Sequence, residues 1–364
     1  MKSSPHHYAV IMAGGGGERF WPMSRMRTPK QLLALVTKRT LIEETVARIA
    51  PLFRRENILI ITNREQAPTI RRLLPSLPAR NIIAEPMRRD TAAAVALSAA
   101  IVAKRNPRGV MAVLPADHVI QDAPQYRRVL ADCLAVAGKQ NVLVTIGIKP
   151  TAPNTGYGYI ETTARTRTAR TRTRFFSVGR FVEKPDLATA KKYLATGRYR
   201  WNAGMFVWSV EAIQTALAKH MPALTAKLRR LDRAIDTPRF DAAVRRLYPT
   251  LERVSIDYGL MEKASNVVVA DGAFAWDDVG SWEALERHLP RDQDGNVARG
   301  HFVGLRSANN IVIGDKRLIA TLGVRDLIIV ETKDATLVCH RSEAQKIKEL
   351  VTWLGRHSAF KRHL

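Results

Sequence analysis

Residues 13–31 read AGGGGERFWPMSRMRTPKQ and directly follow the apolar run of residues 8–12. Four consecutive glycines open the stretch: Gly14, Gly15, Gly16 and Gly17. Glycine tolerates positive φ angles and leaves no Cβ between main-chain N–H groups and an anion. Two cations that follow, Arg19 and Lys30, can bring side-chain charge to the same anion. The stretch therefore predicts a phosphate-binding loop at the end of a strand.

Two common phosphate-loop patterns do not fit these residues. The dinucleotide fingerprint needs a glycine where Arg19 or Phe20 stands, and the nucleotide-hydrolase loop needs Gly-Lys-Ser/Thr after its first glycine. The sequence therefore argues against hydride transfer and against P-loop hydrolysis.

Length and composition indicate a globular protein. The chain has 364 residues, of which 46% are hydrophobic, so it can bury a full core and fits one large domain with a smaller appendage. It contains no run of eighteen apolar residues, and the N-terminal MKSSPHH lacks the apolar segment of a signal peptide. We therefore expect a cytoplasmic protein with no membrane association. Its two cysteines, Cys133 and Cys339, lie in apolar runs without metal-binding spacing, so we expect both to be buried.

The formal net charge of +25 comes from 58 Lys and Arg against 33 Asp and Glu. Such a charge can neutralise nucleic-acid phosphates without reading sequence. The basic residues are scattered over predicted helices, however, in pairs such as Arg71-Arg72, and no aromatic residues interleave with them as single-strand binding requires. We therefore expect no nucleic-acid partner. A basic surface also attracts nucleotides and sugar phosphates, so the charge alone does not identify the ligand.

The first half alternates short apolar runs rich in β-branched residues with longer amphipathic runs. This alternation predicts an α/β fold, a Rossmann-like and mostly parallel sheet with helices on both faces. Ligands bind beyond the carboxyl ends of the strands in such sheets. The glycine stretch, Glu85 and Asp117 end the first, third and fourth predicted strands, so we expect them to converge on one crevice.

The pattern of the sequence changes twice in the second half of the chain. Residues 162–174 read TTARTRTARTRTR, a basic run without an apolar face, which we interpret as a solvated loop or hairpin extension between two strands. Beyond Asp292, short strands alternate with Asn, Gly and Asp turns, which favours a small β-helix-like module followed by a final helix. We expect a catalytic domain over residues 1–290 and this module over residues 291–364, its helix packing on the module or on a partner subunit.

The residues can support transfer of a nucleotidyl group. Mg²⁺ takes oxygen ligands and usually one or two protein carboxylates, with substrate phosphates completing its shell. Asp117 within LPADH and Asp278 before a Val-Gly turn fit that demand. Each could instead be a cap or turn residue, and Asp277 could ligate in place of Asp278. If the attacking group is a phosphate oxygen, it is already an anion at neutral pH and the reaction does not require a general base.

The chain resembles a known family. Residues 14–30 resemble the signature G-G-x-G-x-R-x-x-P-x-S-x-x-x-P-K of sugar nucleotidyltransferases, and Trp21-Pro22 and Pro29-Lys30-Gln31 resemble the mannose-1-phosphate guanylyltransferases. The likeness extends from Tyr8 to about Leu350 through EP, LPADH, GYGYIE, VEKP, WNAGMF and WDDVGSW. It implies the nucleotide-diphospho-sugar transferase fold and Mg²⁺-dependent transfer of GMP from GTP to mannose 1-phosphate, by in-line attack at the α-phosphorus. We expect the short form of the family, without its isomerase-type domain.

The resemblance also implies roles for individual residues. Arg19 and Lys30 would contact the triphosphate, Lys184 of VEKP the sugar phosphate, and Asp117 and Asp278 the metal. The family positions that contact the hexose are Gly158, Glu183 and Asn202. The nucleotide-binding positions are the glycine loop, Glu85, Asp90 and Thr91. Glu85 can accept hydrogen bonds from guanine, whereas Asp90-Thr91 departs from the Asn-Thr that is usual in the family.

Two other functions remain open at this stage. The first is the same chemistry on another manno-configured sugar 1-phosphate or with another nucleoside triphosphate. The second is a non-catalytic, regulatory homologue that binds nucleotide sugars. The second is disfavoured because both metal carboxylates and all three cations are present, and a binding module need not keep them. A homodimer is compatible with the sequence, which does not fix the oligomeric state.

Overall fold

The computed structural model describes residues 4–166 and 171–364. The chain forms two compact units that do not follow chain order. The first unit combines the residues up to Gly14 with Val46–Ala116 and Ile120–Trp276. The second unit combines Gly15–Thr45, Asp117–Val119 and Asp277–Leu364. The division into domains 1–290 and 291–364 stays a prediction.

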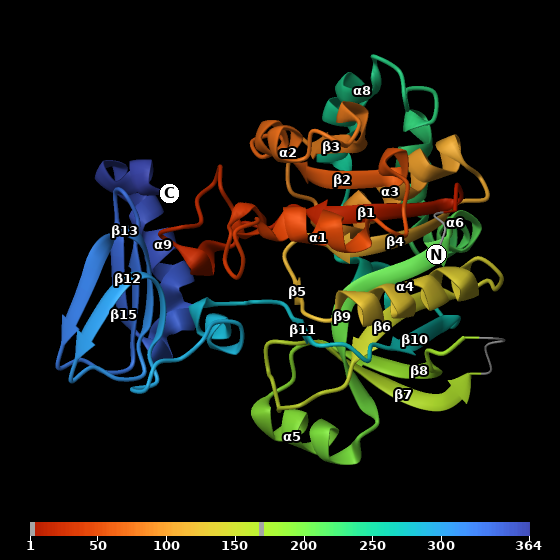
Figure 1. The fold of residues 1–364 in the computed structure, drawn as a ribbon. Helices are drawn as coiled ribbons and strands as arrows, with labels where there is room; N and C mark the ends of the chain where they lie inside the picture. Colours follow the sequence, from red (N-terminus) through yellow and green to blue (C-terminus); the bar gives the residue numbers. More distant parts are fainter. Residues whose placement is uncertain (1–3, 167–170) are drawn as a thin grey trace. The chain divides into compact units, whose positions relative to one another are not determined.

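The described part of the first unit contains a nine-stranded sheet in the order β3-β2-β1-β4-β9-β6-β10-β8-β7 (Figure 1). Its strands are β1 (His7–Ala13), β2 (Ile58–Asn63), β3 (Ile82–Glu85), β4 (Val110–Pro115), β6 (Leu143–Ile148), β7 (Tyr159–Thr166), β8 (Phe175–Val182), β9 (Tyr199–Ser209) and β10 (Val267–Asp271). Strands β3, β2, β1 and β4 run parallel, so their carboxyl ends meet at one edge of the sheet. Glu85, Ala13 and Pro115 lie at this edge.

The sheet is mostly parallel, as predicted, with two reversed strands. Strand β9 runs antiparallel to β4, β6 and β7, and β8 runs antiparallel to β7 and β10. The other strands share one direction, since β10 is parallel to β6 and both run with β4. The α/β class and the mostly parallel sheet are confirmed, and the reversal of β8 and β9 is what the alternating pattern does not predict.

Helices of the first unit pack on this sheet. They are α2 (Ala67–Leu73), α3 (Asp90–Arg105), α4 (Ala123–Ala137), α5 (Leu187–Thr196), α6 (Val210–His220), α7 (Pro222–Leu228) and α8 (Phe240–Leu247), while α1 (Leu41–Ile49) spans the boundary of the two units. One large apolar cluster joins Tyr8 and Val10 of β1 to the alanine-rich α3 and to α6 and α7. Among the described residues, the helices are all too short or too polar to cross a membrane.

The second unit is built on a four-stranded sheet in the order β12-β13-β14-β15. Its elements are β12 (Val297–Leu305), β13 (Ile311–Leu322), β14 (Leu327–Glu331), β15 (Thr336–His340) and α9 (Ile347–Arg356). The first three strands are parallel and β15 is antiparallel to β14. A separate two-stranded sheet pairs β5 (Val119–Ile120) with β11 (Trp276–Asp277).

Residues from the stretch after the glycine loop belong to the core of the second unit. Phe20, Trp21, Leu33 and Leu35 are 8% exposed or less and share one apolar cluster with the C-terminal sheet and helix. The members from the C-terminal part include Ile311, Ile313, Ile328, Val330, Leu337, Ala344 and Ile347. Burying these side chains therefore fixes a segment that has little regular structure of its own.

The described residues of the basic run 162–174 extend the hairpin of β7 and β8, as expected, and contacts anchor them at both ends. Strand β7 extends to Thr166 and pairs with β8, and the buried Thr162 hydroxyl donates to the Arg198 carbonyl oxygen at 2.5 Å. At the other end, Asp132 accepts from the backbone of Thr173 at 2.9 Å, and Arg174 pairs with Asp271 at 2.6 Å. Alternating Thr and Arg residues match the two-residue period of a strand. This period is not recognised when only a helical apolar face is considered. Residues 167–170 of the run lie outside the described residues.

Asn310 is the polar centre of the C-terminal sheet. It is fully buried, donates to Asn296 Oδ1 at 2.9 Å, and accepts from the Leu327 backbone N–H at 2.9 Å. Replacing Asn310 with Ala should lower the free energy of unfolding by about 1–3 kcal/mol, because the Leu327 N–H would be left buried without its acceptor. Urea unfolding followed by circular dichroism measures this change. Lys316→Ala, at an exposed position of β13, should change it by less than about 0.5 kcal/mol.

Candidate active site

Gly17 brings the glycine loop against Lys30. It adopts φ 64° and ψ 28°, the left-handed region that favours glycine. A Cβ at Gly17 would lie 2.4 Å from Lys30 Cβ and 2.7 Å from the Lys30 backbone nitrogen, so a larger residue would push the two segments apart. The Ser24 hydroxyl donates to the Gly17 carbonyl oxygen at 2.6 Å and holds the turn.

Lys30 is a buried cation. The residue is 7% exposed, and its ammonium group lies 2.9 Å from Asp117 Oδ2 and donates to the carbonyl oxygen of Asp278. Burial opposes ionisation of Asp117, but the charges of Lys30 and His118 outweigh it and hold the pKa of Asp117 below its usual range. Three segments of the second unit therefore meet at one ammonium group. The structure brings together Lys30, Asp117 and Asp278, as the sequence predicts.

The neighbouring carboxylates of the WDDVGSW motif have different surroundings. Asp277 is 4% exposed and accepts from the Val279 N–H at 2.8 Å and from Nε and Nη2 of Arg287 at 2.6 and 2.9 Å. It also lies 2.8 Å from His288 Nε2. Burial favours the neutral acid, yet the His288 and Arg287 hydrogen bonds hold the pKa of Asp277 far below its usual range. Both oxygens of Asp277 are thus engaged within the protein, and Asp278 is the better candidate for an external ligand.

The turn after Asp278 is conformationally unusual. Val279 is fully buried and has φ 47°, a value that a β-branched residue rarely adopts. Its N–H donates to the Asp277 side chain, so the carboxylate stabilises the strained turn that presents Asp278. Backbone strain of this kind is often found where a site needs a side chain in one place.

The two carboxylates fit a divalent cation. Asp117 and Asp278 are both partly exposed, and a depressed pKa keeps Asp117 ionised at neutral pH. Mg²⁺ needs only one or two protein carboxylates when phosphates fill the rest of its shell. Among the residues that the structure describes, groups of three or more metal-ligating side chains are absent. Arg19 is exposed in the short helical turn Glu18–Phe20, where it can reach an anion.

The predicted nucleotide residues of the first unit lie at the carboxyl edge of the sheet. A Cβ on Gly14 would lie 3.6 Å from Glu85 Oε2, so the start of the glycine loop is next to this carboxylate. Glu85 is 8% exposed and accepts a hydrogen bond from the Tyr248 hydroxyl. Burial raises the pKa of Glu85 to about 7, although the Tyr248 hydrogen bond opposes the shift. Tyr248, which the sequence analysis did not single out, thus orients Glu85.

Asp90 and Thr91 begin α3. Asp90 has φ 63°, which Asn and Asp tolerate better than other residues with side chains, so either residue can occupy the position. Its side chain accepts from the Thr91 N–H at 2.9 Å, and the Thr91 hydroxyl accepts from the Ile256 N–H at 2.8 Å. These contacts give both residues a structural role, and their predicted contact with the nucleotide stays a prediction.

The three predicted hexose residues lie together in the first unit. A Cβ on Gly158 would lie 2.7 Å from Glu183 Oε2 and 3.5 Å from Asn202 Cβ, so glycine is needed for the close approach. The Asn202 N–H donates to the Gly158 carbonyl oxygen at 2.8 Å. Lys184 is exposed, has φ 43°, and its ammonium lies 2.8 Å from Glu183 Oε1. Carboxylate, amide and ammonium groups are thus available for a sugar phosphate.

Asp257 is a member of this group that the sequence analysis missed. It accepts from Asn202 Nδ2 at 2.8 Å, and burial, with the charge of Glu183, raises its pKa. The bond fixes the side-chain amide, because Asn202 Oδ1 also accepts from the Gly204 N–H at 3.1 Å. The signal in the sequence is weak, since Asp257 follows a loop and starts the short helix Asp257–Met261 like any turn residue.

Comparison with known proteins identifies the family. A family model described as Nucleotidyl transferase matches residues 8–294, and one described as the MannoseP isomerase/GMP-like beta-helix domain matches residues 300–354. A curated protein of Klebsiella pneumoniae named mannose-1-phosphate guanylyltransferase is 39% identical to this chain, over 97% of this chain and 75% of that protein. The chain belongs to the mannose-1-phosphate guanylyltransferase family.

Other relatives agree with this assignment of the enzyme. A protein of the same name from Escherichia coli strain K12 is 36% identical over 96% of this chain and 74% of that protein. A crystal structure from Thermus thermophilus, titled a mannose-1-phosphate geranyltransferase, superposes with a TM-score of 0.85 and 37% identity, over 96% of this chain and 99% of that chain. The predicted family, the nucleotidyltransferase class and the C-terminal β-helix-like module are therefore confirmed.

The surroundings of Asp277 predict a loss of stability in the guanylyltransferase fold when it is changed. Asp277→Asn should lower the free energy of unfolding by about 1–3 kcal/mol, because an amide N–H would face the donors of Arg287 and His288. Urea unfolding measures this, with Asp294→Asn, at an exposed position, as a control variant expected to stay within about 0.5 kcal/mol of the wild type. Equal stability of the two variants would contradict the assignment of Asp277 as the structural carboxylate.

Proposed function

We propose that the enzyme transfers GMP from GTP to mannose 1-phosphate and releases pyrophosphate. The buried ammonium of Lys30, next to the glycine loop and Asp117, is the observation that carries the proposal. Such a cation is placed for phosphate charge rather than for solvent. The names of the curated relatives support the choice of substrates.

The reaction needs positioning and charge more than covalent help from the protein. An oxygen of mannose 1-phosphate attacks the α-phosphorus of GTP, the new P–O bond forms as the bond to the β-phosphate breaks, and pyrophosphate leaves with the electron pair. The nucleophile is an anion already, so no proton has to be removed. Arg19 and Lys30 stabilise negative charge on the triphosphate, where preorganised cations contribute most to the rate.

Asp117 and Asp278 would hold Mg²⁺. The ion would neutralise charge on the α-phosphate and on the leaving pyrophosphate when bound. Lys30 donates to the Asp278 carbonyl oxygen and pairs with Asp117, so it holds both carboxylate-bearing segments in place.

The first unit would select the sugar and the base. Glu183 and Asn202 bind hexose hydroxyls, with Asn202 oriented by Asp257, and the exposed Lys184 binds the sugar phosphate. Glu85 accepts from the N1–H and N2–H₂ donors of guanine, which adenine lacks. An unpaired buried donor costs about 1–3 kcal/mol, so this acceptor discriminates against a base without it.

We further propose a cytoplasmic enzyme that forms a homodimer, without nucleic-acid or membrane partners. Two free cysteines, of which Cys133 is buried and Cys339 half-buried, suit a reducing compartment. Exposed apolar side chains gather on the C-terminal sheet, among them Leu305, Leu318, Leu322 and Val338, each more than half exposed. Such a patch is typical of an interface. A monomer in light scattering at micromolar concentration would remove the dimer proposal.

A pyrophosphate-release assay tests the function. It crosses the four nucleoside triphosphates with the 1-phosphates of mannose, glucose and N-acetylglucosamine. The proposal requires the highest kcat/KM for GTP with mannose 1-phosphate. If another pair of nucleoside triphosphate and sugar 1-phosphate has the highest kcat/KM, the proposed substrates are wrong but the proposed chemistry stands. If the protein binds nucleotide sugars but turns over no pair, it is a regulatory homologue.

Asp278→Asn should lower kcat by at least about 10²-fold, because one carboxylate charge on Mg²⁺ is lost. Steady-state kinetics over a Mg²⁺ titration measures the loss. Asp294→Asn, at an exposed site, serves as the charge-matched control and should retain wild-type turnover. Near-normal turnover of Asp278→Asn with unchanged Mg²⁺ dependence would remove Asp278 from the metal site.

Lys184→Ala should raise KM for mannose 1-phosphate more than KM for GTP, because the cation lost belongs to the acceptor phosphate while the glycine loop is intact. Initial rates with each substrate varied in turn give both constants. Lys191→Ala on α5 is the control for the loss of one exposed positive charge. The opposite ordering of the two KM values would assign Lys184 to the nucleotide.

Glu85 should make GTP use depend on pH. Its pKa of about 7 means that the carboxylate is protonated, and a weaker acceptor, as the pH falls below that value. The ratio of kcat/KM for GTP between the wild type and Glu85→Gln should therefore be largest near about pH 8.5 and shrink towards about pH 5.5. Using the ratio cancels the titration of GTP itself. A ratio that does not change with pH would exclude Glu85 as the titrating acceptor.

A further inference from the structure

The segment that carries Lys30 cannot hold its own shape. Between residues 18 and 35, regular structure consists of two single turns, Glu18–Phe20 and Lys30–Leu32. A single turn of this kind is not stable alone. The position of Arg19 and Lys30 therefore depends on what the rest of the second unit does to this segment.

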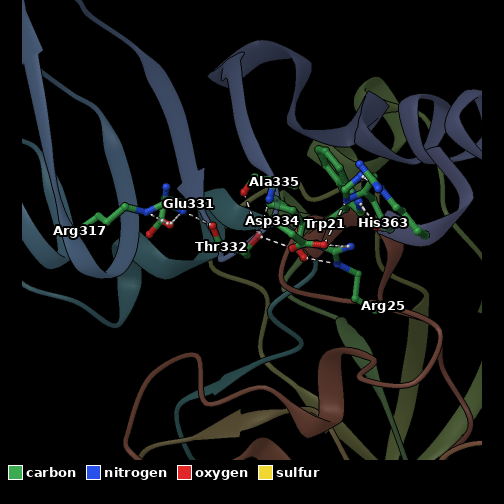
Figure 2. A network of polar contacts seen from close by, with 10 residues as sticks. Trp21, Arg25, Arg317, Glu331, Thr332, Asp334, Ala335 and His363 are labelled. Carbon is green, nitrogen blue, oxygen red and sulfur yellow. Dashed lines mark hydrogen bonds and ion pairs between the residues drawn. The ribbon is translucent and has the colours of Figure 1, made fainter. Parts of the chain in front are cut away.

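The C-terminal end of the chain holds the segment at Trp21. The Trp21 indole Nε1 donates to the carbonyl oxygen of His363 at 2.9 Å (Figure 2). The Trp282 indole donates in turn to the Trp21 carbonyl oxygen at 3.2 Å, and its ring meets Phe20 edge-to-face at 4.9 Å. Trp21 is 8% exposed, so these bonds are largely shielded from water.

An ion pair holds the segment at Arg25. Its Nη2 lies 2.8 Å from Asp334 Oδ1, and its Nε donates to the Pro22 carbonyl oxygen at 2.6 Å. Figure 2 shows Asp334 between Arg25 and His363, whose Nδ1 lies 3.1 Å from Asp334 Oδ2. The Thr332 hydroxyl is 3.3 Å from Asp334 Oδ1 and belongs to the same turn. One carboxylate of the C-terminal sheet therefore joins the segment to the end of the chain.

A third contact follows Lys30. The Arg299 guanidinium of β12 donates to the carbonyl oxygens of Ala34 and Leu35, the latter at 3.1 Å. Lys30 thus lies between two points, Arg25 and Leu35, at which arginine bonds fix the backbone to the C-terminal module. Contacts on both sides of a residue restrict its position far more than a contact on one side alone.

We propose that Arg25, Asp334 and His363 are positioning residues for nucleotide binding. They hold residues 21–35 so that Arg19 and Lys30 are placed for the triphosphate before GTP arrives. The inference rests on the proposed role of these two cations. It gives the C-terminal module a part in the affinity for GTP, because preorganised charge binds more tightly than charge that must be ordered on binding.

Two single variants, Arg25→Ala and Asp334→Ala, separate positioning from simple attraction. They change the net charge in opposite directions. If the pair acted only through its long-range field, Asp334→Ala would strengthen GTP binding and Arg25→Ala would weaken it. Under the proposal both raise KM for GTP by about three- to tenfold, with kcat and KM for mannose 1-phosphate changed less than about twofold. The double variant should be no worse than the worse single variant, since both remove one contact.

Arg317→Ala is the matched control. Arg317 also pairs with a carboxylate of the C-terminal sheet, donating to Glu331 Oε1 at 2.8 Å and to the Thr332 carbonyl oxygen at 2.8 Å, and Figure 2 shows it at the other end of the network. It should leave KM for GTP unchanged. An equal rise in this variant, opposite effects of the two single variants, or an equal rise in both KM values would overturn the proposal.

Calorimetric titration with GTP and Mg²⁺, in the absence of the sugar, gives a second readout. The Kd should rise in both single variants by the same factor as KM, while thermal unfolding checks that the proteins are folded. For a variant that does not fold, the conservative change Asp334→Asn provides the same test. Wild-type protein that does not bind GTP would refute the proposed function, whereas unchanged Kd values in folded variants would refute only this inference.

Discussion

The buried charge of Lys30 is the constraint on which the second unit depends. An ammonium group removed from water is costly unless opposite charge and hydrogen-bond acceptors surround it. Asp117 and the Asp278 carbonyl oxygen supply them, and they come from segments far apart in the sequence. The need to satisfy one cation therefore fixes the glycine loop, the LPADH motif and the WDDVGSW motif in a single arrangement, without any regular secondary structure linking them.

Apolar burial makes that arrangement rigid. Phe20 and Leu35 flank the cation in sequence and are buried in the same cluster as Ile311 and Ile347 of the C-terminal module. Because the loop and the module share a core, separating them would expose apolar surface on both sides. The strained turn at Val279 is tolerated for the same reason, since Asp277 and its arginine and histidine partners fix the turn from one side and the core from the other.

Much of the candidate site could be named from the sequence, because its motifs resemble those of a known family. The resemblance names Gly17, Lys30, Asp117 and Asp278, and the structure places the Lys30 ammonium beside Asp117 and the Asp278 carbonyl oxygen. The chemical roles of these residues stay predictions. The reversed direction of β8 and β9 could not be predicted, because apolar periodicity identifies a strand but not its orientation. The supporting residues Tyr248 and Asp257 could not be predicted either, because their importance depends only on the residues that they contact. The different roles of Asp277 and Asp278 could not be predicted for the same reason, since two identical side chains differ only in their neighbours.

The non-contiguous make-up of the second unit has a consequence for how the protein is made. A ribosome releases residues 15–45 long before Asp334 and His363, yet the contacts at Trp21 and Arg25 need these late residues. Contacts so distant in sequence form slowly, because a long loop of chain must close first. The nascent chain therefore carries an unfinished phosphate loop, with tryptophan and leucine side chains uncovered, until Asp334 and His363 emerge. That segment therefore needs protection during synthesis, and the folded structure gives no sign of this need.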